Sequence, residues 1–200
     1  MPRKTDKRMR LVLAAKTLIH KHGFNLTTLA DIAGEANVPL GNVYYYFKTK
    51  EAIGLAVIES SIAEWTERLA SWSAEPAPMQ RLNAFIQYGL DTVDVTARFG
   101  CPIGGLCQEL GKQGGSLSDV AAKLLHDILA WTVEQFKALG HGQQSADLGL
   151  NLLSMVQGMY LLTHTFKDPK ISVRQTKAIQ NWLQSLSVSK KSGVAQESYA

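Results

Sequence analysis

Side chains that can contact a nucleic acid are concentrated between residues 27 and 50 of this 200-residue chain. Hydroxyl, phenol and ammonium groups donate hydrogen bonds to phosphate oxygens, and an asparagine amide can read a base edge or hold a phosphate. A glycine among them allows a backbone to approach closely. The candidate DNA-contacting residues are Thr27, Thr28, Leu40, Gly41, Asn42, Tyr44, Tyr45, Tyr46, Lys48 and Lys50.

Two short helices with a tight break between them must position these residues. Apolar residues recur at i, i+3, i+4 and i+7 from Leu29 onward, which is one face of a helix. Thr28 stands three residues before Asp31, as in a capping box, so this helix begins at residue 27 or 28. Pro39 disfavours helical geometry before it and suits the first turn of a second helix over residues 40–47.

A helix, a short turn and a second short helix form the layout of a helix-turn-helix. The second helix of such a unit enters the DNA major groove by its N-terminal end. The run Tyr44–Tyr46 favours an outward face, because helical neighbours point about 100° apart and three phenols cannot all face a core. A packed helical hairpin with aromatic filling would have the same periodicity, so periodicity alone leaves both interpretations open.

Positive charge coincides with this motif. Residues 1–50 hold nine lysines and arginines against three acidic residues, a net charge of +6, whereas residues 51–200 hold twelve against fourteen, a net charge of −2. A basic segment on a slightly acidic remainder is typical of a nucleic-acid-binding protein. Residues 1–7 are expected to form a basic arm.

Four segments in this part of the chain have a characteristic composition and spacing: TLADIA at 28–33, ANV at 36–38, GNVYYYF at 41–47 and KEAI at 50–53. Together with Gly23-Phe24 ahead of them, they resemble the N-terminal domain of the TetR family of bacterial transcriptional repressors, over about residues 8–57. Two positions depart from the family pattern. Asn37 replaces a usual glycine, and Leu40 stands where a polar or basic residue is common.

The resemblance implies an all-α fold of about nine helices. It implies a three-helix helix-turn-helix domain over residues 1–49 and a helical domain for effector binding and dimerisation over residues 50–188. Residues 189–200 are polar and lack periodicity, so we expect them to be disordered. The resemblance further implies a repressor that binds a palindromic double-stranded DNA operator as a homodimer and is released by a small-molecule or electrophile effector.

Helical periodicity runs through the rest of the chain, and no strand pattern interrupts it. The helix near 145–166 is apolar on two sides, which suits a core on one side and a second subunit on the other. With the helix near 172–187, it is expected to form the homodimer interface. The predicted longer helices are 6–22, 50–72, 78–98, 116–139, 145–166 and 172–187.

Cys101 and Cys107 are the two cysteines. On one helix their Cα atoms would lie ~9 Å apart along the axis, beyond the ~7 Å limit for a disulfide. Pro102 is a good first helical residue, which places Cys101 at an N-cap where a thiolate is stabilised. The segment from Gly100 onward resembles a branch of TetR-like repressors in which a cysteine senses electrophiles or oxidants. Alternatively, Cys101 fills a tight helix start, and Cys107 is expected in the core.

An effector pocket is expected among the helices of the C-terminal part. Aromatic and methionine side chains at helical spacing are more often ordinary core residues than pocket residues. For His126 and His164 we expect a side chain that faces solvent or is hydrogen-bonded within the protein, rather than one that binds a ligand. The candidate pocket residues are Tyr88, Cys101, Trp131, Gln135, Met155 and Tyr160.

Other function classes find little support. No nucleophile elbow, phosphate-binding loop, metal-ligand cluster or pair of carboxylates at catalytic spacing occurs, so we expect neither an enzyme nor a metal or cofactor site. A helical protein-interaction scaffold is the alternative, but it does not explain the +6 charge on residues 1–50. No apolar run approaches the ~18–20 residues of a membrane span, and no signal peptide is evident, so a cytoplasmic protein is expected.

Overall fold

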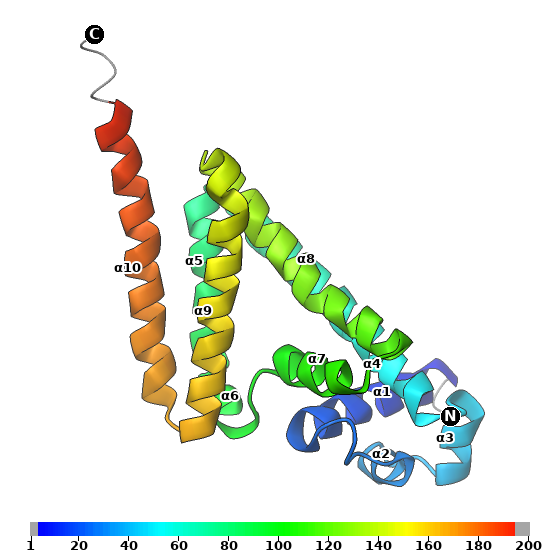
Figure 1. Ribbon diagram of the computed structural model, residues 1–200. Helices are drawn as coiled ribbons and strands as arrows, with labels where there is room; N and C mark the ends of the chain where they lie inside the picture. The colour runs from blue at the N-terminus through cyan, green and yellow to red at the C-terminus, as the bar shows by residue number, and fades with distance from the viewer. Residues whose placement is uncertain (1–3, 195–200) are drawn as a thin grey trace. The chain divides into compact units, whose positions relative to one another are not determined.

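The computed structural model describes residues 4–194 of the chain (Figure 1). The described residues form ten α-helices and one short 3₁₀ helix, with no strand among them. The predicted all-α fold is confirmed. No helix within the described range is long and apolar enough to cross a membrane.

The helices follow one another with short connections. In chain order they are α1 (Lys4–His22), α2 (Leu29–Glu35), α3 (Leu40–Tyr46), α4 (Lys50–Ser73), α5 (Pro78–Asp91), α6 (Val93–Phe99), α7 (Pro102–Gln113), α8 (Ser116–Ala138), the 3₁₀ helix η1 (Gly142–Gln144), α9 (Ser145–Phe166) and α10 (Pro169–Val194).

Three predicted segments differ from the structure. The helix expected over 78–98 is broken at Thr92, whose hydroxyl and backbone N–H both donate to the carbonyl of Tyr88. α10 continues to Val194, so residues 189–194 are helical rather than disordered, and residues 195–200 lie outside the described range. The basic arm was also misassigned in part, because α1 already begins at Lys4.

The chain divides into two compact units. One consists of the chain up to Ala70 together with Phe99–Ile128, and the other of Ser71–Arg98 together with the chain from Leu129 onward. This division differs from the predicted boundary between residues 49 and 50. The reason is that α7, which lies far along the sequence, packs against α1 within the first unit.

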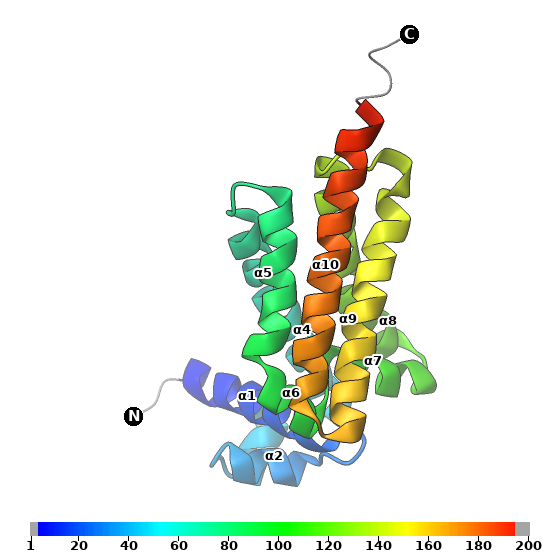
Figure 2. The same cartoon turned by 90° about the vertical axis from the view of Figure 1, so that its left-hand side faces the viewer.

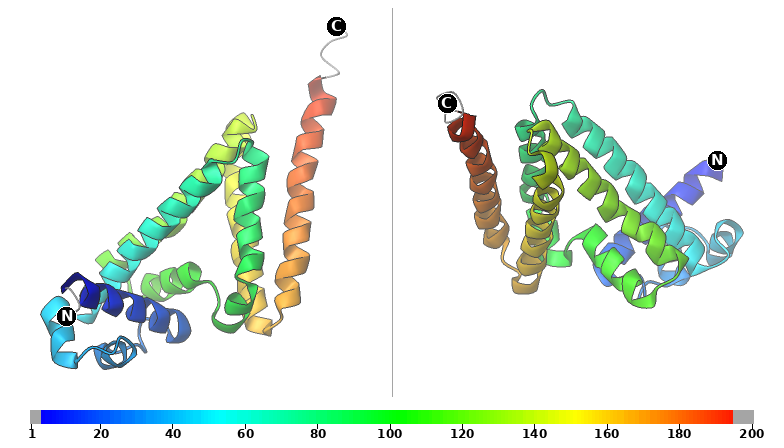
Figure 3. Two further views of the ribbon diagram at one scale, coloured as in Figure 1. Left: turned by 180° about the vertical axis from the view of Figure 1, so that it is seen from behind. Right: turned by 45° about the horizontal axis from the view of Figure 1, so that its top comes forward.

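The first unit has its core between α1, α2, α3 and the start of α4. α2 packs against both α1 and α3, and these helices are drawn from blue to cyan in Figures 1 and 3. The side chains that are fully buried there are apolar, which is the main stabilising contribution to such a domain. They are Leu11, Ala15, Ile32, Val43, Ile53 and Ile58.

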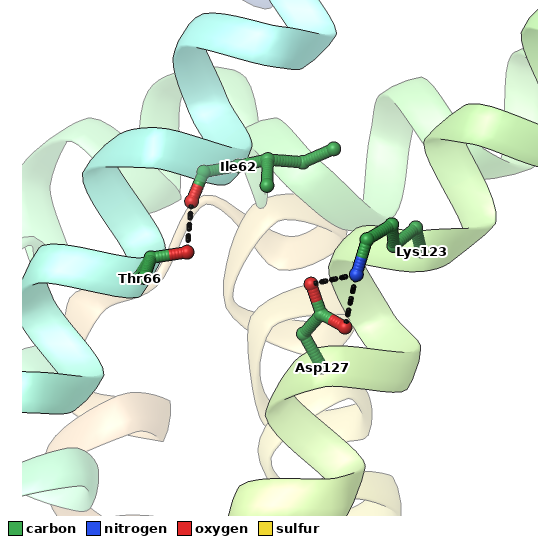
Figure 4. Close-up of polar contacts among 4 residues, drawn as sticks. All are labelled: Ile62, Thr66, Lys123 and Asp127. Atoms are coloured by element: carbon green, nitrogen blue, oxygen red, sulfur yellow. Dashed lines mark hydrogen bonds and ion pairs between the residues drawn. The ribbon is translucent and has the colours of Figure 1, made fainter.

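Two polar contacts of this unit, one on α4 and one on α8, stay within single helices (Figure 4). The hydroxyl of Thr66 donates to the carbonyl of Ile62 at 2.8 Å. Lys123 Nζ donates to both carboxylate oxygens of Asp127, one turn away, at 2.7 and 2.8 Å. Each contact therefore supports its own helix, and neither joins α4 to α8.

In the second unit, α10 packs against both α5 and α9, and the three helices lie side by side (Figures 1 and 2). Their contact faces are apolar and closed to solvent. The most buried large side chains of this unit are Leu82, Ile86, Phe136, Leu152, Met159, Ile179 and Leu183. Thr163 and Ser172 add a buried hydroxyl–hydroxyl hydrogen bond of 2.8 Å between α9 and α10.

Candidate nucleic-acid interface

The turn between α2 and α3 depends on Asn37. Its φ of 49° lies in the left-handed region, which glycine and asparagine adopt more readily than other residues. This geometry explains why asparagine can stand where the family pattern has glycine. Arg10 of α1 donates to the carbonyls of Ala36 and Asn37, and Val38 is buried beside them. The turn that presents α3 is therefore fixed by α1.

α2 begins as its sequence predicted, with Thr28 as the N-cap of a capping box. The backbone N–H of Asp31 donates to Thr28 Oγ1 at 3.1 Å, and the backbone N–H of Thr28 donates to Asp31 Oδ2 at 2.9 Å. The side-chain hydrogen bond from Thr28 lowers the pKa of the Asp31 carboxyl, and the backbone bond lowers it further. The Thr28 hydroxyl is thus engaged at the helix start, although the residue is exposed.

The burial of Thr27 disagrees with the prediction that its side chain contacts DNA. It is only 2% exposed, and its hydroxyl donates to the carbonyl of Gly23 at 2.8 Å. Its side chain therefore stabilises the α1–α2 loop from inside and is not available to a nucleic acid. Spacing in the sequence placed Thr27 next to the motif but could not indicate its burial.

α3 is exposed on one face and buried on the other. Leu40, Tyr44 and Tyr45 are 41%, 47% and 57% exposed, whereas Val43 is fully buried. Leu40 and Tyr44 are four residues apart on the helix and therefore share a face. The prediction that at least one of the three phenols faces outward is confirmed.

The remaining positions of α3 complete this surface. Gly41 is exposed and a side chain there would meet open space, while Asn42 is half-buried. Tyr46 is half-buried and stands edge-on to Tyr45, with ring centroids 5.0 Å apart. Phe47 ends the helix and is buried, with the guanidinium of Arg8 5.2 Å from its ring centroid. α3 therefore has a leucine, a glycine and an amide at its N-terminal end and phenols in its second half, while Val43 and Phe47 are buried beneath them.

The two candidate lysines have different surroundings. Lys48 is exposed, just beyond the end of α3. Lys50 is half-buried, and its Nζ donates to the carbonyl of Asn25 at 2.7 Å and lies 4.8 Å from the ring centroid of Phe24. Lys50 therefore holds the α1–α2 loop against the start of α4. Lys48 is the exposed one of the two lysines.

The α1–α2 loop is also held by α7, through a carboxylate that the sequence did not identify as functional. The backbone N–H groups of Phe24 and Asn25 donate to the two oxygens of Glu109 at 2.6 and 2.7 Å. Gln113, one turn further on, donates to the side-chain oxygen of Asn25. We call these contacts the Glu109 clamp. Glu109 is 84 residues from Asn25 and resembles an ordinary surface glutamate, so only the fold brings the pair together.

Two glycines make room for the clamp. Gly23 has a φ of +88°, and a Cβ there would lie 3.0 Å from an oxygen of Glu109. A Cβ on Gly54 of α4 would come within 2.6 Å of the Phe24 ring, which is closer than any real side chain allows. Both positions therefore need glycine for the loop to sit between α4 and α7.

Cys101 is the N-cap of α7, as its position before Pro102 predicted. Its Sγ accepts the backbone N–H of Gly104 at 3.3 Å. The thiol lines a cavity of about 190 Å³ within the first unit, together with His20 and Glu109. His20 is bonded to the carbonyl of Gly100 at 2.9 Å. Cys101 precedes the first residue of α7, whereas Glu109 lies two turns further along this helix, and both residues line the same cavity.

Cys107 has a more closed environment. It is half-buried, and its Sγ donates to the carbonyl of Ala121 at 3.2 Å. Burial raises the pKa of the Cys107 thiol to about 11, with a smaller contribution from Cys101. Both cysteines are free thiols. Its surroundings therefore favour the unreactive protonated thiol of Cys107.

The predicted effector residues fall in both units. Tyr88 and Trp131 belong to one aromatic cluster of the second unit, where each ring centroid lies 5.9 Å from that of Trp72. Gln135 is 5% exposed, donates to the carbonyl of Trp131 at 3.1 Å and accepts from Arg81 at 3.4 Å.

The other predicted effector residues are not part of that cluster. Met155 is half-buried and Tyr160 is buried on α9, where the Tyr160 hydroxyl lies against Gly89. Cys101 belongs to the first unit. His126 is exposed, and His164 Nδ1 lies 3.0 Å from Lys167 Nζ and 3.3 Å from the carbonyl of Ala97. Within the described range, no three His, Cys, Asp or Glu side chains gather closely enough to hold a metal ion.

Comparison with known proteins agrees with this geometry. Residues 11–57, which contain α2 and α3, match the family described as "Bacterial regulatory proteins, tetR family". An uncharacterized HTH-type transcriptional regulator of Lactococcus lactis subsp. lactis is 26% identical over 164 residues, which cover 80% of this chain and 84% of that protein. The HTH-type transcriptional repressor DhaR of Mycobacterium sp. (strain GP1) is 28% identical over 152 residues, covering 74% and 73%.

The fold is shared with solved structures as well. A TetR-family transcriptional regulator from Streptomyces coelicolor superimposes with a TM-score of 0.80 over 92% of this chain and 97% of its own, at 18% identity. The helix-turn-helix of α2 and α3, the matched family and the similar regulators lead to one conclusion. The chain belongs to the TetR family of bacterial regulatory proteins, and it is a DNA-binding transcriptional regulator rather than an enzyme.

Proposed function

We propose that this protein is a repressor that binds a palindromic operator as a homodimer and leaves it when an effector binds. The observation that carries the DNA-binding part is the two-faced character of α3. Val43 is fully buried, while Leu40 is exposed at the N-terminal end that a recognition helix directs at the major groove, and Tyr44 is exposed one turn later. Lys48, beyond the helix, adds a cation for the phosphate backbone.

Helices α9 and α10 supply the proposed dimer interface. Leu150 and Leu161 are eleven residues apart on α9, which is three helical turns, and both are more than half exposed. Gly158 lies between them along the helix, and a Cβ there would meet open space, so another backbone can approach closely. Phe166 and Val173 extend the exposed apolar side chains to the end of α9 and the start of α10. A second copy of the chain would cover them, as the two-sided apolar pattern of α9 suggests.

Two effector chemistries fit the described residues. The aromatic cluster of Trp72, Phe85, Tyr88 and Trp131, with the buried amide of Gln135, suits an apolar small molecule that carries one polar group. Cys101, at a helix N-cap beside a cavity, suits a soft electrophile instead.

Selection of binding sites from random duplex DNA tests the proposal, carried out with and without N-ethylmaleimide. We expect an enriched palindrome, because a symmetric dimer presents two copies of α3 to two half-sites. Loss of the palindrome on treatment of the wild type but not of Cys101→Ser would favour the electrophile. A palindrome that survives treatment would favour a non-covalent effector. No enrichment would contradict the proposal and support the alternative of a helical interaction scaffold.

A further inference from the structure

Leu40 is the departure from the family pattern that the DNA-binding proposal leaves unexplained. It is the first residue of α3, it follows Pro39, and 41% of it is exposed. Its side chain borders a groove lined by Gly34, Asn37 and Val38. In the free protein this leucine is partly exposed to water at the N-terminal end of the recognition helix.

A leucine at that place can read only one feature of a base pair. Its side chain has no donor or acceptor, so the amino, carbonyl and ring-nitrogen groups of the major groove are desolvated against it without compensation. The 5-methyl group of thymine is the one apolar group that the major groove displays. Contact with a methyl group removes apolar surface of both partners from water and is favourable.

The neighbours of Leu40 suit such a contact. Gly41 follows it with open space around its Cβ position, so the helix tip can approach the groove closely. Tyr44 lies on the same face one turn later and is 47% exposed, which allows its phenol to donate to a phosphate and fix the position of the helix. Asn42 is available for a neighbouring base.

We propose that Leu40 is a specificity-determining residue that recognises a pyrimidine 5-methyl group, normally that of thymine, at one fixed position of each operator half-site. The inference rests on the proposed function, because it requires that α3 enter the major groove. Beyond that function, it specifies that the base at this position must carry a 5-methyl group.

The test uses the operator recovered by site selection. Each thymine is replaced in turn by deoxyuridine, which pairs in the same way and lacks only the 5-methyl group. We expect one symmetry-related pair of positions at which the affinity of the wild-type protein falls by about fourfold for each methyl group removed, the value for burying one such group. Fluorescence anisotropy at constant salt measures the dissociation constants.

Variants connect this effect to the side chain. Leu40→Ala should bind thymine and deoxyuridine operators equally at that pair of positions, while Leu40→Met should keep most of the difference. Leu13→Ala removes a leucine that is 51% exposed on α1 and should keep the wild-type profile. At the same positions, 5-methylcytosine should bind the wild type better than cytosine does, and Leu40→Ala should not distinguish them.

The outcomes separate this inference from the proposed function. If the wild type binds a palindrome but its deoxyuridine profile is unchanged in Leu40→Ala, the role of Leu40 is wrong and the operator-binding proposal stands. If no duplex is bound by the wild type, the proposed function itself fails. Circular dichroism of Leu40→Ala confirms that its helices are retained, as expected for a substitution of an exposed side chain.

Discussion

At the scale of single residues, Asn37 shows how one backbone angle limits what the turn can contain. Its φ of 49° costs an ordinary L-residue about 1–2 kcal/mol, less for asparagine, and nothing of this kind for glycine. We expect Asn37→Ala to lower the free energy of unfolding by about 1 kcal/mol, and Asn37→Gly to leave it close to the wild-type value. Urea unfolding followed by circular dichroism measures both. Equal stability of Asn37→Ala and Asn37→Gly would contradict the role of this angle.

Cys107 gives a second prediction at this scale. In the wild type the pKa of the Cys107 thiol is raised from 9.0 to about 11, chiefly by burial and to a smaller extent by Cys101. Cys101→Ser leaves Cys107 as the sole thiol and keeps the larger of these two causes. Because the thiolate is the reactive form, labelling of Cys107 in this variant by iodoacetamide near pH 8 should be slower in the folded protein than in urea, by up to about a hundredfold.

The same shift has a consequence for stability, and its sign is fixed by the direction of the shift. A raised pKa in the folded state favours the protonated thiol there. The contribution of Cys107 to the free energy of unfolding is therefore fully present below pH 9 and is lost as the pH rises toward 11.

For the labelling experiment, equal rates in folded and unfolded protein would show that the Cys107 thiol is not shielded.

At the scale of helices and loops, the Glu109 clamp is the contact with the largest expected effect. Glu109→Ala leaves the N–H groups of Phe24 and Asn25 without their acceptor, and hydrogen bonds to a charged group are worth more than neutral ones. Since the site is partly exposed, we expect a loss of about 1–2 kcal/mol. Hydrogen exchange of the Phe24 and Asn25 amides should become faster.

A matched control for the clamp is Glu64→Ala. Glu64 forms an exposed ion pair with Lys16 of α1 within the same unit. Exposed pairs contribute about 0–1 kcal/mol, so this variant should leave the two amides nearly as protected as in the wild type. Similar exchange in both variants would mean that Glu109 is an ordinary surface carboxylate.

The helix boundaries and the contacts between helices differed in how far the sequence could predict them. Boundaries set by local chemistry were predicted, as at Thr28 with Asp31, which form the capping box that begins α2. The break at Thr92 was missed because the apolar periodicity continues through it. α10 begins at Pro169, three residues before the start of the helix predicted over 172–187.

For the candidate interface, the sequence predicted the residues of α3 but not the state of each side chain. Thr27 is adjacent to the motif and yet buried, and Lys50 holds a loop carbonyl. Such differences depend on which neighbours the fold supplies. Spacing along one helix contains no information about those neighbours, and this also explains why Glu109 was missed.

At the scale of the whole molecule, the exposed apolar face of α9 predicts the oligomeric state. Leu161→Lys places a charge on that face, and burying it against a second copy would be costly. We expect this variant to be monomeric by light scattering and to bind operator much more weakly, since two linked half-site contacts become one. Leu13→Lys changes an exposed leucine of the first unit and should remain dimeric. A dimeric Leu161→Lys protein would place the interface elsewhere.

The Glu109 clamp has a consequence for exchanging parts between regulators. The loop at Phe24 and Asn25 receives its hydrogen-bond acceptors from α7, about 85 residues later in the chain. A chimaera that grafts residues 1–57 onto another regulator would keep the recognition helix but lose these acceptors, unless the recipient offers a carboxylate at the same place. Transplanting the DNA specificity of this protein therefore requires moving two distant stretches of sequence together.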